Sequence, residues 1–94
     1  MYDETVQDFL VEADGKLSDI EKFKNAQDMP NYAILVHSLK SDSKYLGMMD
    51  LADIAYKHEM ASKENNVDFV NSNYDELMKL AKEKVEMLKK YIGN

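Results

Sequence analysis

Residues 30–47 read PNYAILVHSLKSDSKYLG and follow the period of an α-helix. His37 falls on one side of that helix, close to Ala33 and Lys44. Proline favours the first position of a helix, which places the start at Pro30. The opposite face collects the side chains that would enter a core, namely Tyr32, Leu35, Val36, Leu39, Ser43 and Leu46. The pattern therefore predicts a helix that packs against a core and holds His37 outside it.

Three further segments show the same period. Apolar residues recur at three- and four-residue steps over residues 3–24, 48–63 and 67–91. Residues 71–73, Asn-Ser-Asn, form helix poorly, so the last helix could also begin only at residue 74. Short polar breaks separate the segments, and connections of this length join antiparallel neighbours in helix bundles. The sequence predicts an all-α protein, an antiparallel up-down four-helix bundle, in a single domain of residues 1–94.

Composition excludes several classes of function. The chain has no cysteine, which rules out disulfides and thiolate metal sites and suits the reducing cytoplasm, where we expect the protein. A net charge of -6 makes nucleic acid an unsuitable partner, because binding it needs a basic surface. The first residues are acidic, so we expect no secretory signal. No apolar run approaches the ~18 residues that span a membrane, so we expect no membrane partner.

His37 and Lys40 are one helical turn apart, which makes their side chains neighbours. Imidazole, with an ordinary pKa of about 6.5, is nucleophilic in its neutral form and can attack a phosphoryl group. A nearby ammonium group can pair with the product by a charge-assisted hydrogen bond worth roughly 1.5–3 kcal/mol. The spacing therefore points to phosphoryl transfer, whereas an exposed histidine without such a neighbour is usually only solvated.

The order of residues after His37 adds a second indication. The matching residues are HSLKSDS at 37–43, Leu-Gly at 46–47 and Leu-Ala at 51–52. This run resembles the signature of histidine-containing phosphotransfer (HPt) domains of two-component phosphorelays, roughly His-x-Leu-Lys-Gly-x-Ser/Ala followed by Leu-Gly, Leu and Leu-Glu. The resemblance extends over the whole bundle. It implies that His37 is the phosphoacceptor and that Lys40 helps to hold the phosphoryl group.

Two positions depart from the family pattern. Ser41 stands where the family usually has glycine, and its small side chain should still let a partner approach. His58-Glu59 stands where the family has Leu-Glu, so a histidine occupies an apolar position. We expect His58 to pack in or beside the core with a hydrogen-bond partner and to take no part in transfer. No second histidine follows at the spacing of a zinc-protease helix, so we expect no metal site.

The resemblance implies a monomeric phosphoryl carrier rather than an enzyme. The chain also has no glycine-rich loop that could bind ATP. It would accept a phosphoryl group from an aspartate of one receiver domain and pass it to an aspartate of another. We expect no cofactor on this chain and Mg²⁺ on the receiver. The predicted docking patch, rimmed by Lys40 and Lys44, consists of Ala33, Ile34, Ser38, Ser41, Tyr45 and Met48.

Three other classes of protein remain as alternatives. The phosphoacceptor region of a sensor kinase usually has an acidic residue after its histidine and a proline downstream. Here Ser38 follows the histidine, and Pro30 lies upstream. The second alternative is a phosphorylation-inactive bundle that only binds receivers as an adaptor, and the third is an unrelated helical adaptor with a chance motif.

Overall fold

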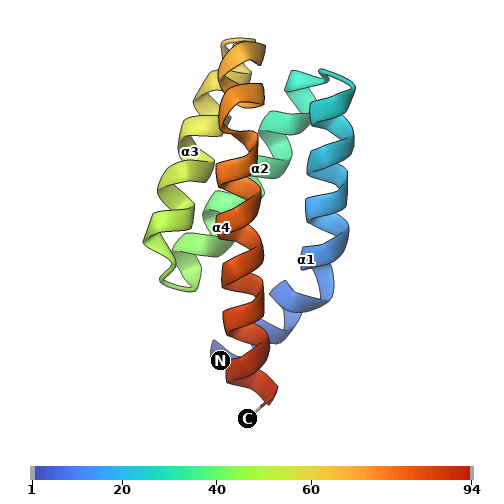
Figure 1. Ribbon diagram of the computed structural model, residues 1–94. Helices are drawn as coiled ribbons and strands as arrows, with labels where there is room; N and C mark the ends of the chain where they lie inside the picture. The colour runs from blue at the N-terminus through green and yellow to red at the C-terminus, as the bar shows by residue number, and fades with distance from the viewer. Residues whose placement is uncertain (1, 94) are drawn as a thin grey trace.

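The structure, a computed structural model, describes the backbone of residues 2–93 and the side chains of residues 6–92. Its four helices follow one another around a bundle that measures 40 × 20 × 19 Å (Figure 1). They are α1 (Tyr2–Asn25), α2 (Met29–Tyr45), α3 (Met49–Lys63) and α4 (Val67–Gly93). Each packs against its neighbours in sequence, and α1 also packs against α4. The prediction of an all-α, up-down four-helix bundle is confirmed.

Local signals in the sequence set the ends of α2. The Asp28 carboxylate accepts a hydrogen bond from the backbone N–H of Asn31 at 3.3 Å, and Pro30 lies in the first turn, where no donor is lost. Beyond the other end of the helix, Gly47 adopts a φ of 81°. A left-handed residue of this kind commonly ends a helix, and glycine adopts it at the least cost because it has no Cβ. The helix that carries His37 is therefore bounded by its own sequence.

The fourth helix begins at Val67, so the alternative start at residue 74 is wrong. Asn66 caps this helix, with its side-chain oxygen 3.1 Å from the backbone nitrogen of Phe69. The side chain of Asn73 donates to the carbonyl of Phe69 at 2.9 Å, inside the helix. Val70 in the same turn is fully buried. Capping and packing thus outweigh the weak helix propensity of residues 71–73.

The apolar face predicted for α2 lies in the core. Val36 and Leu39 are 0% and 1% exposed, and they flank His37 in the sequence. Burying an aliphatic side chain of this size stabilises the fold by about 1.5–3 kcal/mol. Turning α2 about its axis would expose these residues, so packing in the core fixes the direction in which His37 points.

His58 is buried, as expected, and is fully hydrogen-bonded. Its Nδ1 lies 2.9 Å from the hydroxyl of Tyr32, and its Nε2 lies 3.2 Å from the carbonyl oxygen of Asn73. Because a carbonyl only accepts, Nε2 donates and Nδ1 accepts from the tyrosine. Burial lowers the pKa of His58, which favours this neutral form. The Phe69 ring packs edge-on against the imidazole, with 5.6 Å between ring centroids.

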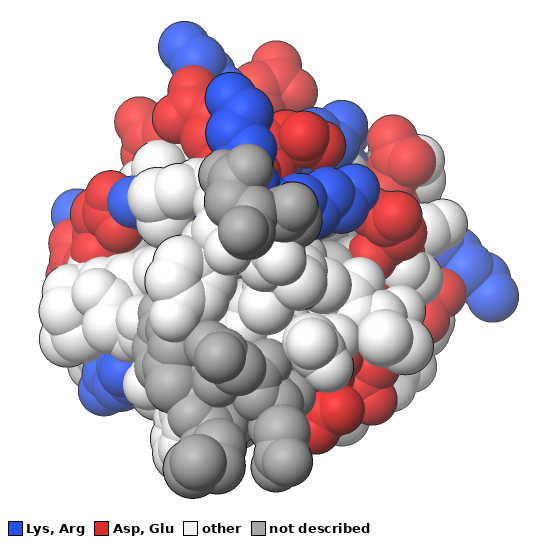
Figure 2. Space-filling model, turned by 90° about the horizontal axis from the view of Figure 1, so that it is seen from below, with Lys and Arg blue, Asp and Glu red and all other residues white. Residues whose placement is uncertain are grey.

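Figure 2 views the end of the bundle at which α1 begins and α4 ends, and there uncharged side chains of the described residues lie beside charged side chains at the rim. Within the described residues, no helix has a segment long and apolar enough to cross a membrane.

Replacing Tyr32 by phenylalanine should leave Nδ1 of His58 without its partner. An unsatisfied buried polar group costs about 1–3 kcal/mol, so Tyr32→Phe should lower the free energy of unfolding by that amount in urea titrations. Tyr45→Phe removes a hydroxyl from an exposed ring and serves as the control. Adding His58→Leu to Tyr32→Phe should recover part of the loss, because both polar partners are then absent. A fully additive loss in the double variant would contradict this account.

Candidate functional site

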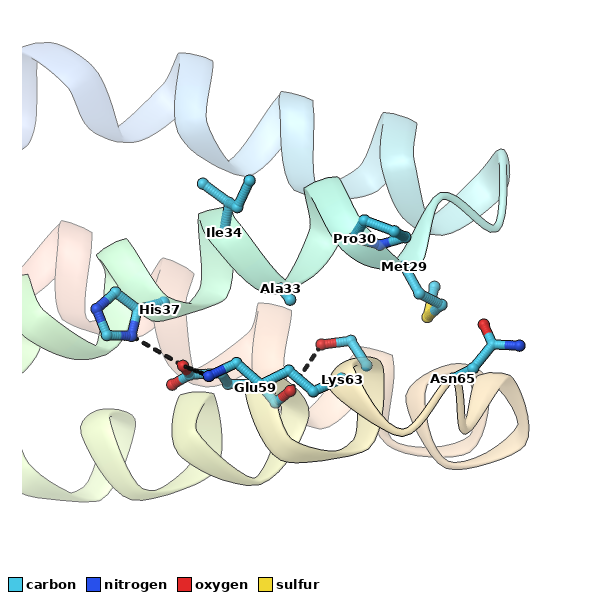
Figure 3. A pocket seen from close by; sticks show the side chains of 9 residues that line it. Met29, Pro30, Ala33, Ile34, His37, Glu59, Lys63 and Asn65 are labelled. Atoms are coloured by element: carbon cyan, nitrogen blue, oxygen red, sulfur yellow. Dashed lines mark hydrogen bonds and ion pairs between the residues drawn. The ribbon is translucent and has the colours of Figure 1, made fainter.

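A buried carboxylate, Glu59 of α3, lies beside His37 of α2 (Figure 3). The Glu59 side chain is 3% exposed. Its Oε2 lies 2.9 Å from Nδ1 of His37 and 3.0 Å from Nζ of Lys63. Its Oε1 lies 2.8 Å from Nζ of Lys40. The carboxylate is thus shared by three basic side chains, two from α2 and one from α3.

These contacts determine the protonation of the site. Burial disfavours the ionised form of Glu59, but the ion pairs with Lys40 and Lys63 and the hydrogen bond with His37 outweigh it and lower the pKa of Glu59 to about 2. An ionised carboxylate only accepts hydrogen bonds. In the neutral His37 ring the proton therefore sits on Nδ1, and the lone pair sits on Nε2.

The far edge of the His37 ring is open to solvent. The side chain is 56% exposed, and within the described residues no hydrogen bond engages Nε2. Figure 3 shows the ring with Nδ1 turned toward Glu59 and its opposite edge turned away. A reacting group can therefore reach Nε2 while Nδ1 stays held.

Lys40 reaches the site through Glu59. Its side chain is 14% exposed, and its ammonium group also lies 5.2 Å from the centre of the Tyr56 ring. Oε1 of Glu59 has no hydrogen bond of good geometry in the described part of the chain, so Lys40 is its charge partner. The structure brings Lys40 and His37 together as predicted, with a carboxylate between them that the sequence analysis did not include.

A third lysine, Lys16, anchors the other flank of α2. Nζ of Lys16, from α1, donates to Oγ of Ser38 at 2.8 Å and to the Asp42 carboxylate at 2.7 Å. The Lys16 side chain is 14% exposed. Ser38, a predicted docking residue, is therefore half-buried and turned toward α1.

The other predicted docking residues differ in their exposure to solvent. Ile34 and Tyr45 are 64% and 70% exposed, and Ser41 and Lys44 are exposed as well. Ala33 is buried but lines a groove beside His37.

The assignment of Met48 to the docking patch is wrong. Its side chain is 4% exposed and belongs to the hydrophobic core. Gly47, with its positive φ, reverses the chain after α2, so the helical face that carries His37 does not continue to Met48. The residue instead stands at the start of α3 and packs inward.

The groove beside His37 runs between the first turns of α2 and the end of α3 (Figure 3). Its volume is about 680 Å³. The residues that line it are Met29, Pro30, Ala33, Ile34, His37, Glu59, Ser62, Lys63 and Asn65. No group of three or more His, Asp or Glu side chains that could hold a metal ion occurs among the described residues.

Sequence reasoning missed Glu59 and Lys63 as site residues. The signal for Glu59 was its match to the glutamate of the family's Leu-Glu pair. The signal for Lys63 was its spacing of four residues from Glu59, which makes the two side chains neighbours on a helix. Neither signal showed that this pair faces His37, which lies 22 residues earlier in the chain.

Compared with models of known protein families, the sequence matches the Hpt domain over residues 4–90. The match takes in His37, Lys40, Glu59 and Lys63. Comparisons with curated proteins and with solved structures give no significant match.

Acid should remove the stability that comes from ionised Glu59. The pKa of this group falls from 4.5 to about 2 on folding, so the unfolded chain takes up the proton first as the pH drops. The contribution is present above about pH 4.5 and is lost as the pH falls toward 2. Urea titrations should therefore show a difference in unfolding free energy between wild type and Glu59→Gln that changes over this range. Glu83→Gln removes an exposed carboxylate on α4 and is the matched control, and a difference for Glu59→Gln that is constant with pH would refute the assignment.

Proposed function

We propose, because this chain belongs to the Hpt domain family, that His37 accepts a phosphoryl group from a receiver aspartate and passes it to another. Hpt domains are phosphoryl carriers that interact with receiver domains in phosphorelays. The observation that supports the role of His37 most strongly is its hydrogen bond to Glu59. That bond holds Nδ1 and leaves Nε2 at a solvent-exposed edge.

The transfer step uses the lone pair on Nε2. It attacks the phosphorus of the receiver's aspartyl phosphate, and a P–N bond forms as the P–O bond to the aspartate breaks. The electron pair of the broken bond returns to the aspartate carboxylate. The proton stays on Nδ1, so the imidazole ring becomes positively charged. The reverse reaction delivers the phosphoryl group to the aspartate of the next receiver.

Glu59 favours this step because charge develops next to it. As the ring becomes positive, the carboxylate 2.9 Å from Nδ1 stabilises it. The contact lies in a buried position, where electrostatic interactions are stronger than in water. Glu59 also keeps the ring in one orientation, which presents Nε2 to the partner.

The two lysines give the site a positive excess. The ammonium groups of Lys40 and Lys63 face a single carboxylate, so one positive charge remains when the ring is neutral. This excess attracts the phosphoryl group. We place the divalent cation on the receiver, because a phosphorylated receiver aspartate already lies among the carboxylates that hold such an ion.

The direct test is to incubate the protein with Mg²⁺ and a panel of receiver domains whose aspartate carries a radiolabelled phosphoryl group. Label should appear on the wild-type protein, should be acid-labile, and should be absent from His37→Gln. Circular dichroism confirms that this variant keeps its helices. If no receiver transfers label, the relay proposal is wrong, and binding without transfer would favour the adaptor alternative.

Removing the carboxylate should slow the chemical step. Groups that orient a metal-binding histidine typically contribute roughly 10–100-fold, and Glu59 orients His37 by the same kind of hydrogen bond, so Glu59→Ala should lower the rate constant of transfer at saturating receiver by about that factor. Glu59→Gln should lie between this variant and wild type, because an amide oxygen accepts the hydrogen bond but carries no charge. Rapid-quench assays measure the rate, with Glu83→Ala as the control. Equal rates for wild type and Glu59→Ala would exclude Glu59 from the mechanism.

A further inference from the structure

We propose that His58 positions Glu59 for the transfer step and makes that positioning sensitive to acid. His58 is 1% exposed, so it takes no part in the chemistry and acts through Glu59, the next residue of α3. The inference rests on the proposed function, because it concerns the carboxylate that holds His37.

The imidazole of His58 joins three helices. Its Nδ1 accepts a hydrogen bond from the Tyr32 hydroxyl of α2 at 2.9 Å, and its Nε2 donates to the Asn73 carbonyl of α4 at 3.2 Å. Glu59 leaves the same turn of α3 and reaches the histidine helix α2. The contacts that fix His58 therefore also fix the place from which Glu59 extends.

This arrangement has no acceptor for a second proton on the His58 ring. A protonated imidazole has two N–H donors, so Nδ1 would face the hydroxyl that now donates to it. Tyr32 is 0% exposed, and within the described residues its hydroxyl bonds to no group besides His58. Reversing the hydroxyl would leave its own proton buried without a partner, which is unfavourable.

The surrounding groups do not offset a positive charge on His58. Its helix packs mainly against α2 and α4. From α2 the ring meets Tyr32, and burial holds the pKa of that hydroxyl above its usual range, so it stays neutral. From α4 the ring meets the uncharged Phe69 and Asn73. The carboxylate of Glu76, also on α4, acts on His58 from an exposed position, where water weakens its effect.

Taking up a proton therefore requires the His58 ring to reach water. It does so when α3 moves away from Tyr32 or from Asn73, which hold the ring from the two neighbouring helices. That movement carries Glu59 with it, and the 2.9 Å contact with Nδ1 of His37 is lost. Acid then slows transfer at a second point, besides protonating Nε2 of His37 directly.

The pH range of this effect follows from the direction of the shift. Burial lowers the pKa of His58 from 6.5, so as the pH falls the unfolded chain takes up the proton before the folded protein does. The stability that neutral His58 contributes is fully present above pH 6.5 and is lost as the pH falls toward the lower, folded pKa. This range lies above the one in which Glu59 titrates, between 4.5 and about 2.

The first measurement isolates the titration of His58. The chain has two histidines, so the His37→Gln protein keeps only this imidazole. Urea titrations from roughly pH 7.5 to 5 compare it with the same protein carrying Tyr32→Phe and His58→Leu, in which both polar partners are absent. The unfolding equilibrium constant of the first protein, relative to the second, should rise by up to about tenfold per pH unit below 6.5, as release of one proton site requires.

A second variant guards against poor folding of the apolar pair. His58→Gln does not titrate, and its amide can both accept from Tyr32 and donate to the carbonyl of Asn73. In the His37→Gln protein it should give the same relative rise. A ratio of unfolding constants that stays constant with pH would overturn the proposal, because His58 would then take up its proton in the folded protein without cost.

The second measurement is the pH profile of transfer, which a purely structural role of His58 would not change. One phosphorylated receiver with Mg²⁺ is used at saturation, and rates are compared only at pH values where circular dichroism shows both proteins folded. The receiver and His37 titrate in wild type and in Tyr32→Phe/His58→Leu alike, so the ratio of their rate constants reports on His58. Since losing the group that orients a histidine costs roughly 10–100-fold, this ratio should fall by about threefold or more between pH 7.5 and 5.

The outcomes separate the two proposals. If no receiver labels the wild-type protein, the proposed function fails, and the role of His58 in transfer fails with it. If label is transferred but the ratio of rate constants is the same at every pH, His58 does not position Glu59 and the relay function stands. A falling ratio together with the pH-dependent stability supports the inference.

Discussion

A carboxylate buried between two helices has to be compensated by positive charge, and Glu59 obtains that charge from side chains of both α2 and α3. Leaving such a group unpaired costs about 3–5 kcal/mol, so the partners are part of the fold as well as of the site. His37 and Lys40 reach it from α2, and Lys63 reaches it from its own helix. The contact that ties α2 to α3 is therefore the same contact that orients the imidazole.

The apolar core and the polar contacts between α2 and α3 support each other. On α2, Val36 and Leu39 turn inward and leave His37 at the rim. On α3, the consecutive residues His58 and Glu59 point in directions about 100° apart, so one enters the core and the other meets the rim. Polar groups with fully specified partners permit fewer alternative packings than apolar ones do. The orientation of the His37 ring is thus fixed by the packing of Val36 and Leu39 in the core and by its hydrogen bond to the Glu59 carboxylate.

The sequence predicted the four helices and the outward direction of His37, because helical period and caps are local signals. It did not predict that Glu59 would hold the imidazole, because the two residues lie 22 positions apart and meet only through the pairing of α2 with α3. The error at Met48 has a different cause. A helical face was extended past a glycine whose φ of 81° ends that geometry. Pattern reasoning succeeded within each helix and failed where the chain turned or two helices met.

The groove lies at the opposite end of the bundle from the start of α1 and the end of α4. α1 begins and α4 ends at one end, whereas Met29 and Asn65, which line the groove, lie next to the α1–α2 and α3–α4 turns at the other (Figure 1). The long axis of 40 Å separates these two ends. A fusion partner or an immobilisation tag can therefore be attached at either terminus without covering the reactive histidine. The same geometry allows the bundle to be tethered within a larger assembly while His37 and the groove beside it stay accessible.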